Sequence, residues 1–448
     1  MLPDALMMAV HFAHTRWSLD FRNRDQLESW QQRQLKHFTH KVLPLAPRYR
    51  GMKGTDLSAL PTMDKASMMG DFFAGNTRGI QLTEALEVAL NAEATRDFSP
   101  MLGDLTVGLS SGTSGNRGVF LVSDAERLRW AGILLARAVP PHLLARLLSP
   151  WQAPLRIAFF LRANSNLYMT LNSHRIDFSF YDLLLGADAA LFRLNSSQPD
   201  VLVGPPSLLR ALAAESCAGR LHIRPSHVIS VAEVLEERDV EAIYAAFDCR
   251  PHQLYQATEG FLAYTCEAGT LHLNESFVHI EPDWLDNTHT RFQPIITDFS
   301  RHAQLIVRYR LNDVLRLAEQ PCACGRAELA IASIEGRADE VMWLPAHATG
   351  HAVAIFPDQL RRAMLFAGQE VAEYDLTQSG MHLKIGLLPA GERQNAISQV
   401  ASQLDKLWIS LGVQAPTLGF TDWLPPQPGG KRCRIHLDHP PKGLQCMF

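Results

Sequence analysis

A regular alternation of short apolar runs with helical stretches, starting near residue 105, sets the strongest limit on the fold. The runs LTVGLSS, GVFLVS, LRIAFFL, PDVLVGPP, SHVISVAEV and RPHQLYQAT have the length and the β-branched content of buried strands. Helical stretches such as SLLRALAAESCA and LEERDVEAIYAAF lie between the later runs. This order favours a largely parallel sheet covered by helices, in which the loops at the carboxyl ends of the strands gather the ligand.

The segments on either side of this alternation differ from it. Residues 1–104 are expected to be mainly helical, because WSLDFRNRDQLESWQQRQLKHFTHKVLPL repeats apolar residues at intervals of three and four. Beyond EGRADEVMW, two helices, a strand and a tail rich in proline, glycine and basic residues are typical of a small α+β domain. We therefore predict an α/β fold. A large domain with mostly parallel sheets flanked by helices would cover residues 1–337, and a small α+β domain would cover residues 338–448.

Composition and charge favour small-molecule chemistry. The 448 residues are 47% hydrophobic with a formal net charge of -4, so the chain lacks the basic footprint of a nucleic-acid-binding or membrane-surface protein. The longest apolar stretches, such as AGILLARAV, are too short to span a bilayer, and the N-terminus lacks the pattern of a signal peptide. We expect a cytoplasmic protein that binds neither nucleic acid nor membrane.

The run LSSGTSGNRG, from Leu109 to Gly118, is either a linker or structural turn, or a loop that holds an anion. It lies between two predicted strands, so its backbone N–H groups can converge on one point beside several hydroxyl groups. It is not a P-loop, since no Gly-Lys-Ser/Thr sequence opens a helix there. The residues of the candidate phosphate cradle are Ser110, Ser111, Gly112, Thr113, Ser114 and Gly115.

Two Cys/His pairs form a candidate metal site. Cys266 and His272 flank the turn CEAGTLH, and Cys322 and Cys324 form a second pair later in the chain. Four soft ligands are the usual complement of a structural zinc site in a reducing compartment. Reduced structural cysteines are the alternative, because Cys-x-Cys is a less common ligand spacing than Cys-x-x-Cys.

Four motifs follow the Ser/Gly run in a fixed order: YQATEG, RYRLND, GRADE and GGKRCR. Together they resemble the adenylate-forming superfamily of acyl-CoA synthetases and related ligases. Two further matches, PCACGRAEL before EGRADE and VGPPSLLRAL before SVAEVLEE, are similar to the phenylacetate-CoA ligase branch and its deazaflavin-coenzyme adenylyltransferase relatives. The resemblance extends from about residue 105 to the tail.

The resemblance implies the reaction of a carboxylate with ATP to give acyl-AMP and pyrophosphate, in which catalysis is mostly positioning and charge neutralisation. The Ser/Gly loop would hold the departing phosphates. Thr258 would contact the α-phosphate, and Glu259 would help to hold Mg²⁺. Asp313 would accept hydrogen bonds from the ribose hydroxyls, with Arg337 nearby. Taken singly, Asp313 and Arg337 could equally form a surface pair, and Glu259 could be an acidic residue at a helix N-terminus; the ordered set of motifs favours the functional reading. The positions that match the adenine-binding wall are Ala232, Glu233, Tyr255, Gln256 and Ala257.

The resemblance also assigns roles in the small domain. Lys431 in GGKRCR would neutralise the forming acyl-phosphate, and Asp339 would be the hinge about which this mobile domain rotates between half-reactions. A solvated basic tail is the alternative for Lys431, because Arg432 and Arg434 lie beside it.

The sequence departs from the family pattern at two places. Asn116 stands where many members have a lysine, and Arg117 one residue later is expected to supply the positive charge. Gln256 stands where a glycine is usual, and its side chain would narrow the acyl pocket. The missing lysine leaves a catalytically silent nucleotide-binding relative as an alternative reading.

The acyl pocket is expected around RANSNLYMTLNSHRIDF. This segment is more polar than a fatty-acyl tunnel requires, which favours a small carboxylic acid, aromatic or hydroxylated, over a long-chain one. Its polar residues are Asn164, Asn166, Tyr168, His174 and Arg175. Three acceptors stay open: CoA, the phosphopantetheine of an acyl carrier protein, or a hydroxyl that receives AMP itself. Whether the chain forms a homodimer is also open.

Overall fold

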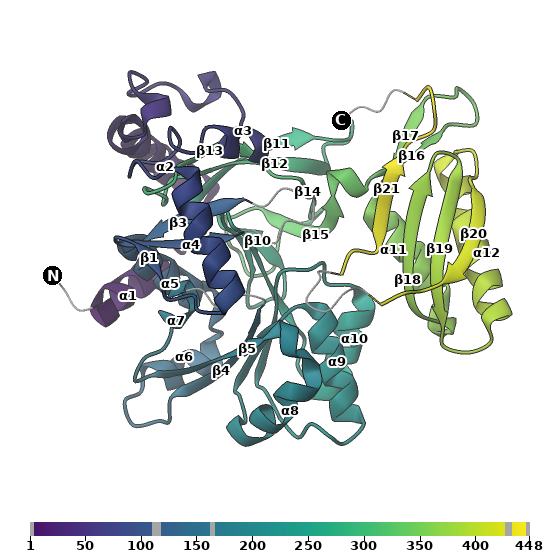
Figure 1. The fold of residues 1–448 in the computed structure, drawn as a ribbon, viewed down its shortest axis with the longest axis horizontal. Helices are drawn as coiled ribbons and strands as arrows, with labels where there is room; N and C mark the ends of the chain where they lie inside the picture. The colour runs from purple at the N-terminus through teal and green to yellow at the C-terminus, as the bar shows by residue number, and fades with distance from the viewer. Residues whose placement is uncertain (1–3, 110–117, 162–165, 426–431, 445–448) are drawn as a thin grey trace. The chain divides into compact units, whose positions relative to one another are not determined.

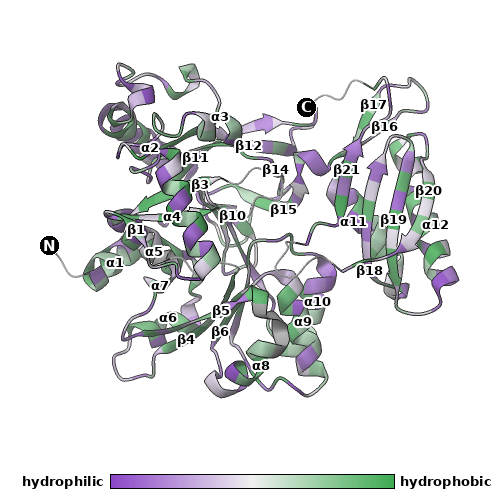
Figure 2. Ribbon diagram, viewed as in Figure 1, coloured by the Kyte–Doolittle hydropathy of each residue, from purple (hydrophilic) through white to green (hydrophobic). Residues whose placement is uncertain are grey.

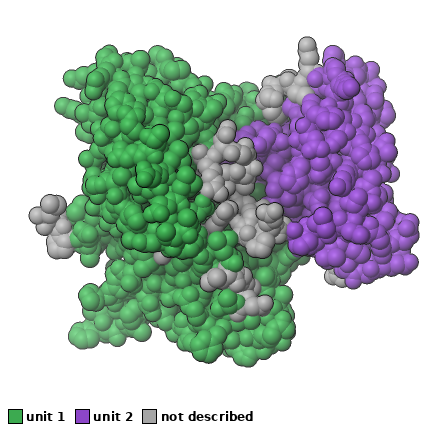
Figure 3. Space-filling model, in the orientation of Figure 1, with its two compact units in different colours: residues 1–311, 317–333 green, residues 312–316, 334–448 purple. Residues whose placement is uncertain are grey.

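The structure is a computed structural model that describes residues 4–109, 118–161, 166–425 and 432–444. The chain divides into two compact units, drawn in different colours in Figure 3. Unit 1 comprises residues 1–311 and 317–333, and unit 2 comprises residues 312–316 and 334–448. The predicted boundary between a domain of residues 1–337 and a domain of residues 338–448 stays a prediction.

Helices dominate the N-terminal part of unit 1 (Figure 1). Asn23 caps one of them, because its side chain accepts hydrogen bonds from the N–H groups of Asp25 and Gln26. The α-helices are α1 (Asp4–Ala13), α2 (Arg24–His37), α3 (Lys65–Gly70) and α4 (Leu82–Thr95). Asn76 is fully buried and holds the turn before α4. Its Nδ2 donates a hydrogen bond to the Ile80 carbonyl, and its Oδ1 accepts one from the Ile80 N–H group.

A small antiparallel sheet follows, and it flanks the Ser/Gly run. Its strands are β1 (Met101–Leu102), β2 (Leu105–Leu109) and β3 (Val119–Ser123). Leu109 pairs with Val119 across β2 and β3. Helix α5 (Asp124–Ala138) begins directly after β3 with a capping box between Ser123 and Glu126.

The centre of unit 1 is a parallel sheet with the strand order β8-β7-β6-β4-β5. This part confirms the predicted α/β architecture. The strands are β4 (Leu155–Leu161), β5 (Ile176–Asp182), β6 (Val201–Gly204), β7 (His227–Ser230) and β8 (His252–Ala257). The helices along this stretch are α6 (Pro141–Leu148), α7 (Asn166–Met169), α8 (Gly186–Ser197), α9 (Pro206–Cys217) and α10 (Glu237–Phe247).

Beyond β8 the sheet becomes antiparallel, which corrects the expectation of mostly parallel sheets for this half of the unit. Consecutive strands here are joined by turns such as residues 258–259 and 266–270, which are too short for a crossover helix. The strands that follow β8 are β9 (Gly260–Thr265), β10 (Leu271–Leu273), β11 (Val278–Trp284), β12 (Arg291–Asp298), β13 (Ile306–Arg310), β14 (Asp313–Leu317) and β15 (Ala330–Arg337). Residues 313–316 of β14 and 334–337 of β15 belong to unit 2.

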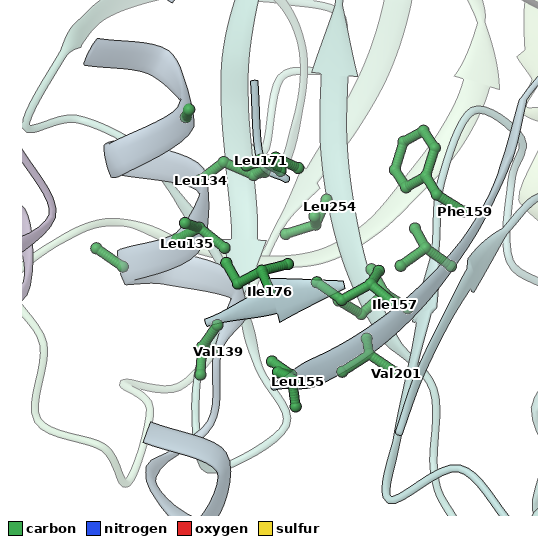
Figure 4. Close-up of a cluster of buried hydrophobic side chains, with 14 of the residues drawn as sticks. Leu134, Leu135, Val139, Leu155, Ile157, Phe159, Leu171, Ile176, Val201 and Leu254 are labelled. Atoms are coloured by element: carbon green, nitrogen blue, oxygen red, sulfur yellow. The ribbon is translucent and has the colours of Figure 1, made fainter. Parts of the chain in front are cut away.

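Buried apolar clusters cover both faces of the parallel sheet. Along β4, Ile157 and Phe159 belong to the cluster that packs against α5, drawn in Figure 4. Ala158 and Phe160, which alternate with them, belong to the cluster formed with α8, α9 and α10. A strand buried on both faces reads as a continuous apolar run, and LRIAFFL is such a run.

Unit 2 is a small α+β structure, as predicted for the C-terminal part. Its main sheet has the order β20-β19-β18-β21, with an antiparallel centre and parallel outer pairs. Buried and exposed residues alternate along β19, and Figure 2 shows both hydrophobic and hydrophilic residues in this sheet. Its elements are η7 (Ala338–Glu340), β16 (Met342–Pro345), β17 (Ala352–Ile355), α11 (Pro357–Phe366), β18 (Val371–Ser379), β19 (His382–Pro389), α12 (Arg393–Leu411), β20 (Thr417–Asp422) and β21 (Ile435–His439).

Within the described ranges, no helix combines the length and the apolar content that a membrane crossing requires.

Candidate functional site

The turn between β8 and β9 carries the Thr258–Glu259 pair at the edge of the parallel sheet. Thr258 Oγ1 donates a hydrogen bond of 2.8 Å to Glu259 Oε2, and the Glu259 carboxylate is buried. Gly260 follows, and a Cβ atom there would lie 3.0 Å from Asp298 Oδ2, so a larger residue would crowd that carboxylate. The turn therefore presents a hydroxyl and a carboxylate together, with glycine packed closely behind them.

The predicted adenine-wall residues leave the same edge of the sheet. Strands β7 and β8 are parallel, and Ser230, the last residue of β7, lies opposite Gln253, so β8 continues past the end of β7 by four residues. Ala232 follows β7 in a left-handed conformation with φ of 69°, an uncommon conformation for a residue that has a side chain. Tyr255, Gln256 and Ala257 end β8, where the register with β9 shifts between Tyr255 and Gln256. The parallel pairing brings the two predicted segments to the carboxyl edge of the sheet, the edge at which open α/β sheets generally bind ligands.

The Glu233 side chain contacts the start of the neighbouring helix α9. The carboxylate accepts a hydrogen bond of 3.3 Å from the N–H group of Ser207, in the first turn of α9. A carboxylate at this position offsets the positive end of the helix dipole. Its carboxylate therefore helps to begin α9, and its contribution to the predicted adenine wall stays a prediction.

The Ser/Gly loop lies outside the described residues. This covers Ser110, Ser111, Gly112, Thr113, Ser114, Gly115 and Arg117, together with Asn116. Its two flanking strands are described, and Gly108 pairs with Phe120 between them. A Cβ atom at Gly108 would overlap the Phe120 ring, so a larger residue at this position in β2 would force that ring to move.

The predicted ribose and hinge residues belong to unit 2. Asp313 begins β14 and Arg337 ends β15. The N–H group of Ala338 donates a hydrogen bond of 2.8 Å to the Asn312 carbonyl, which brings the residues after Asn312 close to those before Ala338. Asp339 lies within the short helix η7. The last two residues of RYRLND, Asn312 and Asp313, therefore meet the GRADE motif within unit 2.

The segment after GGK also approaches η7. Cys433 Sγ donates a hydrogen bond of 3.3 Å to Glu340 Oε1. Arg434 is buried and pairs with Glu373 at 2.7 Å, so this arginine is structural and does not belong to a solvated tail. Lys431 itself lies outside the described residues.

The four predicted metal ligands converge in unit 1. Cys266 follows β9, His272 lies in β10, and Cys322 and Cys324 lie in the loop before β15. Their ligand atoms all lie within 4.8 Å of one another. Cys266 Sγ is 3.6 Å from Cys322 Sγ, and Cys324 Sγ is 3.4 Å from His272 Nε2. Ligands about 2.0–2.3 Å from a tetrahedral zinc are separated by about 3.5 Å, so the donor set fits this ion.

His272 is oriented by its second ring nitrogen. Nδ1 lies 2.9 Å from the Glu328 carbonyl oxygen, which leaves Nε2 directed at Cys324. The Glu328 carboxylate forms a fully buried ion pair with Arg137 of α5 at 3.2 Å. The metal-ligand loop is thereby connected to the core of unit 1.

Some residues of the predicted acyl segment have structural roles, and others line a cavity. Tyr168 is surrounded by aromatic rings, with ring centroids 4.7 Å from Phe159 and 5.5 Å from Trp130, and burial raises its pKa to about 12. Arg175 donates to the carbonyl groups of residues 146, 147 and 152, so its charge is used structurally. His174 is exposed at a cavity of about 580 Å³. Asn164 and the side chain of Asn166 lie outside the described residues.

The segment from Asp298 to Gln304 supports the site, although no motif in the sequence marks it. Arg301 and Gln304 form hydrogen bonds with β3, and Arg301 also reaches the Thr258 carbonyl. Its only signal in the sequence is a cluster of polar residues between two apolar strands, DFSRHAQ, which does not by itself distinguish a loop from a support for a site.

The fold of this chain is similar to that of a solved acyl-CoA ligase. The chain superposes on 2-hydroxyisobutyryl-CoA ligase in its postadenylation state, in complex with 2-HIB-AMP, with a TM-score of 0.62 and 15% sequence identity over 92% of this chain and 88% of that one. The open conformation of that ligase, in complex with 2-HIB-AMP and CoA, gives a TM-score of 0.53 and 14% identity over 91% and 90% of the two chains. No protein-family model and no curated protein matches the sequence. The fold expected from the motifs is therefore confirmed.

Proposed function

We propose that this protein is an ATP-dependent acid–thiol ligase that converts a small carboxylic acid to an acyl-AMP and then to a thioester of CoA. The observation that carries the proposal is the Thr258–Glu259 turn at the carboxyl edge of β8, on the fold of the adenylate-forming ligases. The similar 2-hydroxyisobutyryl-CoA ligase has been captured with an acyl-adenylate and with CoA.

In the first half-reaction, a carboxylate oxygen of the acid attacks the α-phosphorus of ATP, and pyrophosphate leaves. Thr258 would donate a hydrogen bond to an α-phosphate oxygen in place of its hydrogen bond to Glu259, which lies in the same turn. Glu259 offers a buried carboxylate, the hard oxygen donor that Mg²⁺ prefers. Bound there, Mg²⁺ would neutralise the phosphate charge.

The remaining contacts follow the matched motifs. Asp313 would bind the ribose hydroxyls with Arg337 nearby, and the edge formed by Ala232 and Tyr255 would cover the adenine. The Ser/Gly loop and Arg117 would hold the leaving pyrophosphate, and Lys431 would neutralise charge at the reacting centre. In the second half-reaction, the thiolate of CoA attacks the acyl carbon and AMP leaves.

The acid is proposed to be short and hydroxylated or aromatic. Two observations support this class: the rings of Trp130, Phe159 and Tyr168 gather along the acyl segment, and the similar ligase carries a hydroxylated short acyl group. An acyl carrier protein in place of CoA, and a homodimer, are compatible with this proposal.

We further propose that Cys266, His272, Cys322 and Cys324 hold a structural zinc ion. The convergence of four soft donors supports it, because a closed set of four leaves no position for substrate. The ion would join the turn after β9 to the loop before β15 and would take no part in the chemistry.

The experiment is acid-dependent pyrophosphate release with ATP, Mg²⁺ and CoA over a library of short hydroxy acids and aryl acids, with thioesters identified by mass spectrometry. T258A and E259Q should each lower the rate of pyrophosphate release at least about a hundredfold, because each variant loses one or two oriented contacts to the charged reacting centre. T288A, at an exposed turn, is the matched control and should retain activity. AMP transfer to a hydroxyl without thioester formation would instead identify an adenylyltransferase.

A further inference from the structure

The side chain of Arg301 reaches three separate elements of unit 1. Its Nη2 donates a hydrogen bond of 2.9 Å to the carbonyl of Leu121 in β3, and its Nη1 lies 3.5 Å from the carbonyl of Thr258. Its Nε lies 3.9 Å from Glu126 Oε1 at the start of α5. Only 11% of the side chain is exposed. One guanidinium therefore spans the strand that follows the Ser/Gly loop and the turn that carries Glu259.

The Glu126 carboxylate holds the Arg301 guanidinium in place through this ion pair. Its Oε2 accepts hydrogen bonds from the N–H and hydroxyl groups of Ser123, at 2.8 and 2.6 Å. Its Oε1 accepts hydrogen bonds from the N–H groups of His302 and Ala303, at 2.5 and 3.0 Å. Burial opposes its ionisation, but the Arg301 charge and these donors hold the pKa of Glu126 below its ordinary value. The ionised carboxylate joins β3 and α5 to the segment that carries Arg301.

Gln304 completes the same connection. The N–H group of Leu121 donates to Gln304 Oε1 at 2.9 Å, and Gln304 Nε2 donates to the Val119 carbonyl at 3.3 Å. Strand β3 pairs with β2 along one edge, so the side chains of Arg301 and Gln304 satisfy backbone groups along the other. The position of β3 thus depends on the segment from Asp298 to Gln304.

We propose that Arg301 is a positioning residue that sets the distance between strand β3 and the Thr258–Glu259 turn. The inference rests on the proposed function, in which the chain entering β3 and the Thr258–Glu259 turn act on the same triphosphate. They belong to different hairpins, β2–β3 and β8–β9, and Arg301 contacts the backbone of both. Small displacements between groups that act on one substrate are sufficient to lose binding and rate.

Arg129 provides a matched control. It is a partly buried arginine of α5 whose Nη1 donates a hydrogen bond of 2.8 Å to the carbonyl of Ser300, in the same segment as Arg301. The structure shows no hydrogen bond from Arg129 to Thr258 or to β3 within the described residues. Its replacement therefore removes an arginine contact to the segment without breaking the connection between the two hairpins.

The test compares binding of Mg·ATP by wild-type, R301M, R301K and R129M proteins, measured by titration calorimetry, with hydrogen exchange of residues 119–123 and 258–262. R301M should weaken binding about tenfold and speed exchange in both segments, the effect expected of lost hydrogen bonds from a charged donor. R301K should fold and bind with an intermediate affinity, because lysine keeps the charge but not the forked geometry. R129M should resemble the wild type.

Equal affinities for R301M and wild type would overturn the positioning role and leave the proposed function intact. Equal weakening in R301M and R129M would also overturn it, because the segment would then act only as general support. If R301M does not fold, R301K decides: wild-type affinity with wild-type exchange in both segments contradicts the proposal. A wild-type protein that does not bind Mg·ATP overturns the proposed function, and this inference with it.

Discussion

Cys324 Sγ lies 3.4 Å from His272 Nε2, although 52 residues separate the two along the chain. The contact closes a set of four donors whose other members, Cys266 and Cys322, are 3.6 Å apart. Both distances match the edges of a zinc tetrahedron. The fold brings Cys266 and His272, near the end of β9, together with Cys322 and Cys324, in the loop before β15.

The purified protein should therefore contain one zinc ion per chain. C322S combined with C324S should abolish metal binding and lower the thermal midpoint, because the ligand loop would lose its ion. C217S, at an exposed cysteine of α9, should retain the metal. Elemental analysis of the three proteins measures this, and zinc retained by the double variant would contradict the proposed ligand set.

The buried pair of Arg137 and Glu328 should be essential to stability. Both side chains are almost fully buried, at 3% and 0% exposed, so R137M would leave an uncompensated carboxylate. We expect the free energy of unfolding to fall by about 3–5 kcal/mol. R78M, which removes the exposed partner of Asp104, should change it by at most about 1 kcal/mol. Urea denaturation measures the free energy of unfolding of both variants. A loss of similar size in R137M and R78M would contradict the prediction.

Stability should also decrease in acid because of His227. Burial, with His252 and His142 nearby, lowers the pKa of His227 to about 3, and His252 lies 4.7 Å away between ring centroids. The unfolded chain binds a proton near pH 6.5, whereas the folded protein does not until about pH 3. The contribution of neutral His227 to the free energy of unfolding is therefore complete above pH 6.5, and it is lost as the pH falls from 6.5 toward 3.

H227Q tests this dependence. The difference in unfolding free energy between wild type and variant should be constant near pH 8 and should shift in favour of the variant on acidification to pH 4.5. The shift has an upper limit of about 1.4 kcal/mol per pH unit. Parallel pH profiles for the two proteins would show that His227 does not cause the acid sensitivity.

Replacement of Lys431 should separate the two half-reactions. K431A should strongly reduce formation of acyl-AMP and should affect thioester formation from supplied acyl-AMP much less, because the lysine charge is needed only where the phosphate charge develops. K442A, at an exposed lysine of the same tail, is the control. Loss of both half-reactions to the same degree, or of neither, would refute the assignment.

The sequence was most informative where chemistry is tied to residue type. The four proposed metal ligands could be named because closely spaced cysteine and histidine residues are rare enough to be noticed, and the order of motifs led to the correct fold. The antiparallel strands beyond β8 were not foreseen, because a short apolar run carries no information about the direction of its neighbour. The polar segment around Arg175 was read as part of a pocket, whereas Arg175 binds backbone carbonyls.

The role of Arg301 could not be read from the sequence for a different reason. Its partners, Leu121, Glu126 and Thr258, come from distant parts of the chain, and their proximity is a product of the tertiary fold. A loop arginine next to serine and histidine has no characteristic spacing. Such residues become visible only when buried polar groups are traced to their partners.

The most direct test of the proposed function is isotope exchange between pyrophosphate and ATP, since it reports acyl-adenylate formation without requiring the correct thiol. Wild-type protein with Mg²⁺ should catalyse exchange that depends on a short hydroxy acid or aryl acid, and E259Q should lower it at least about a hundredfold. Absence of acid-dependent exchange across both classes, in a protein that binds Mg·ATP, would contradict the assignment as an acid-activating ligase.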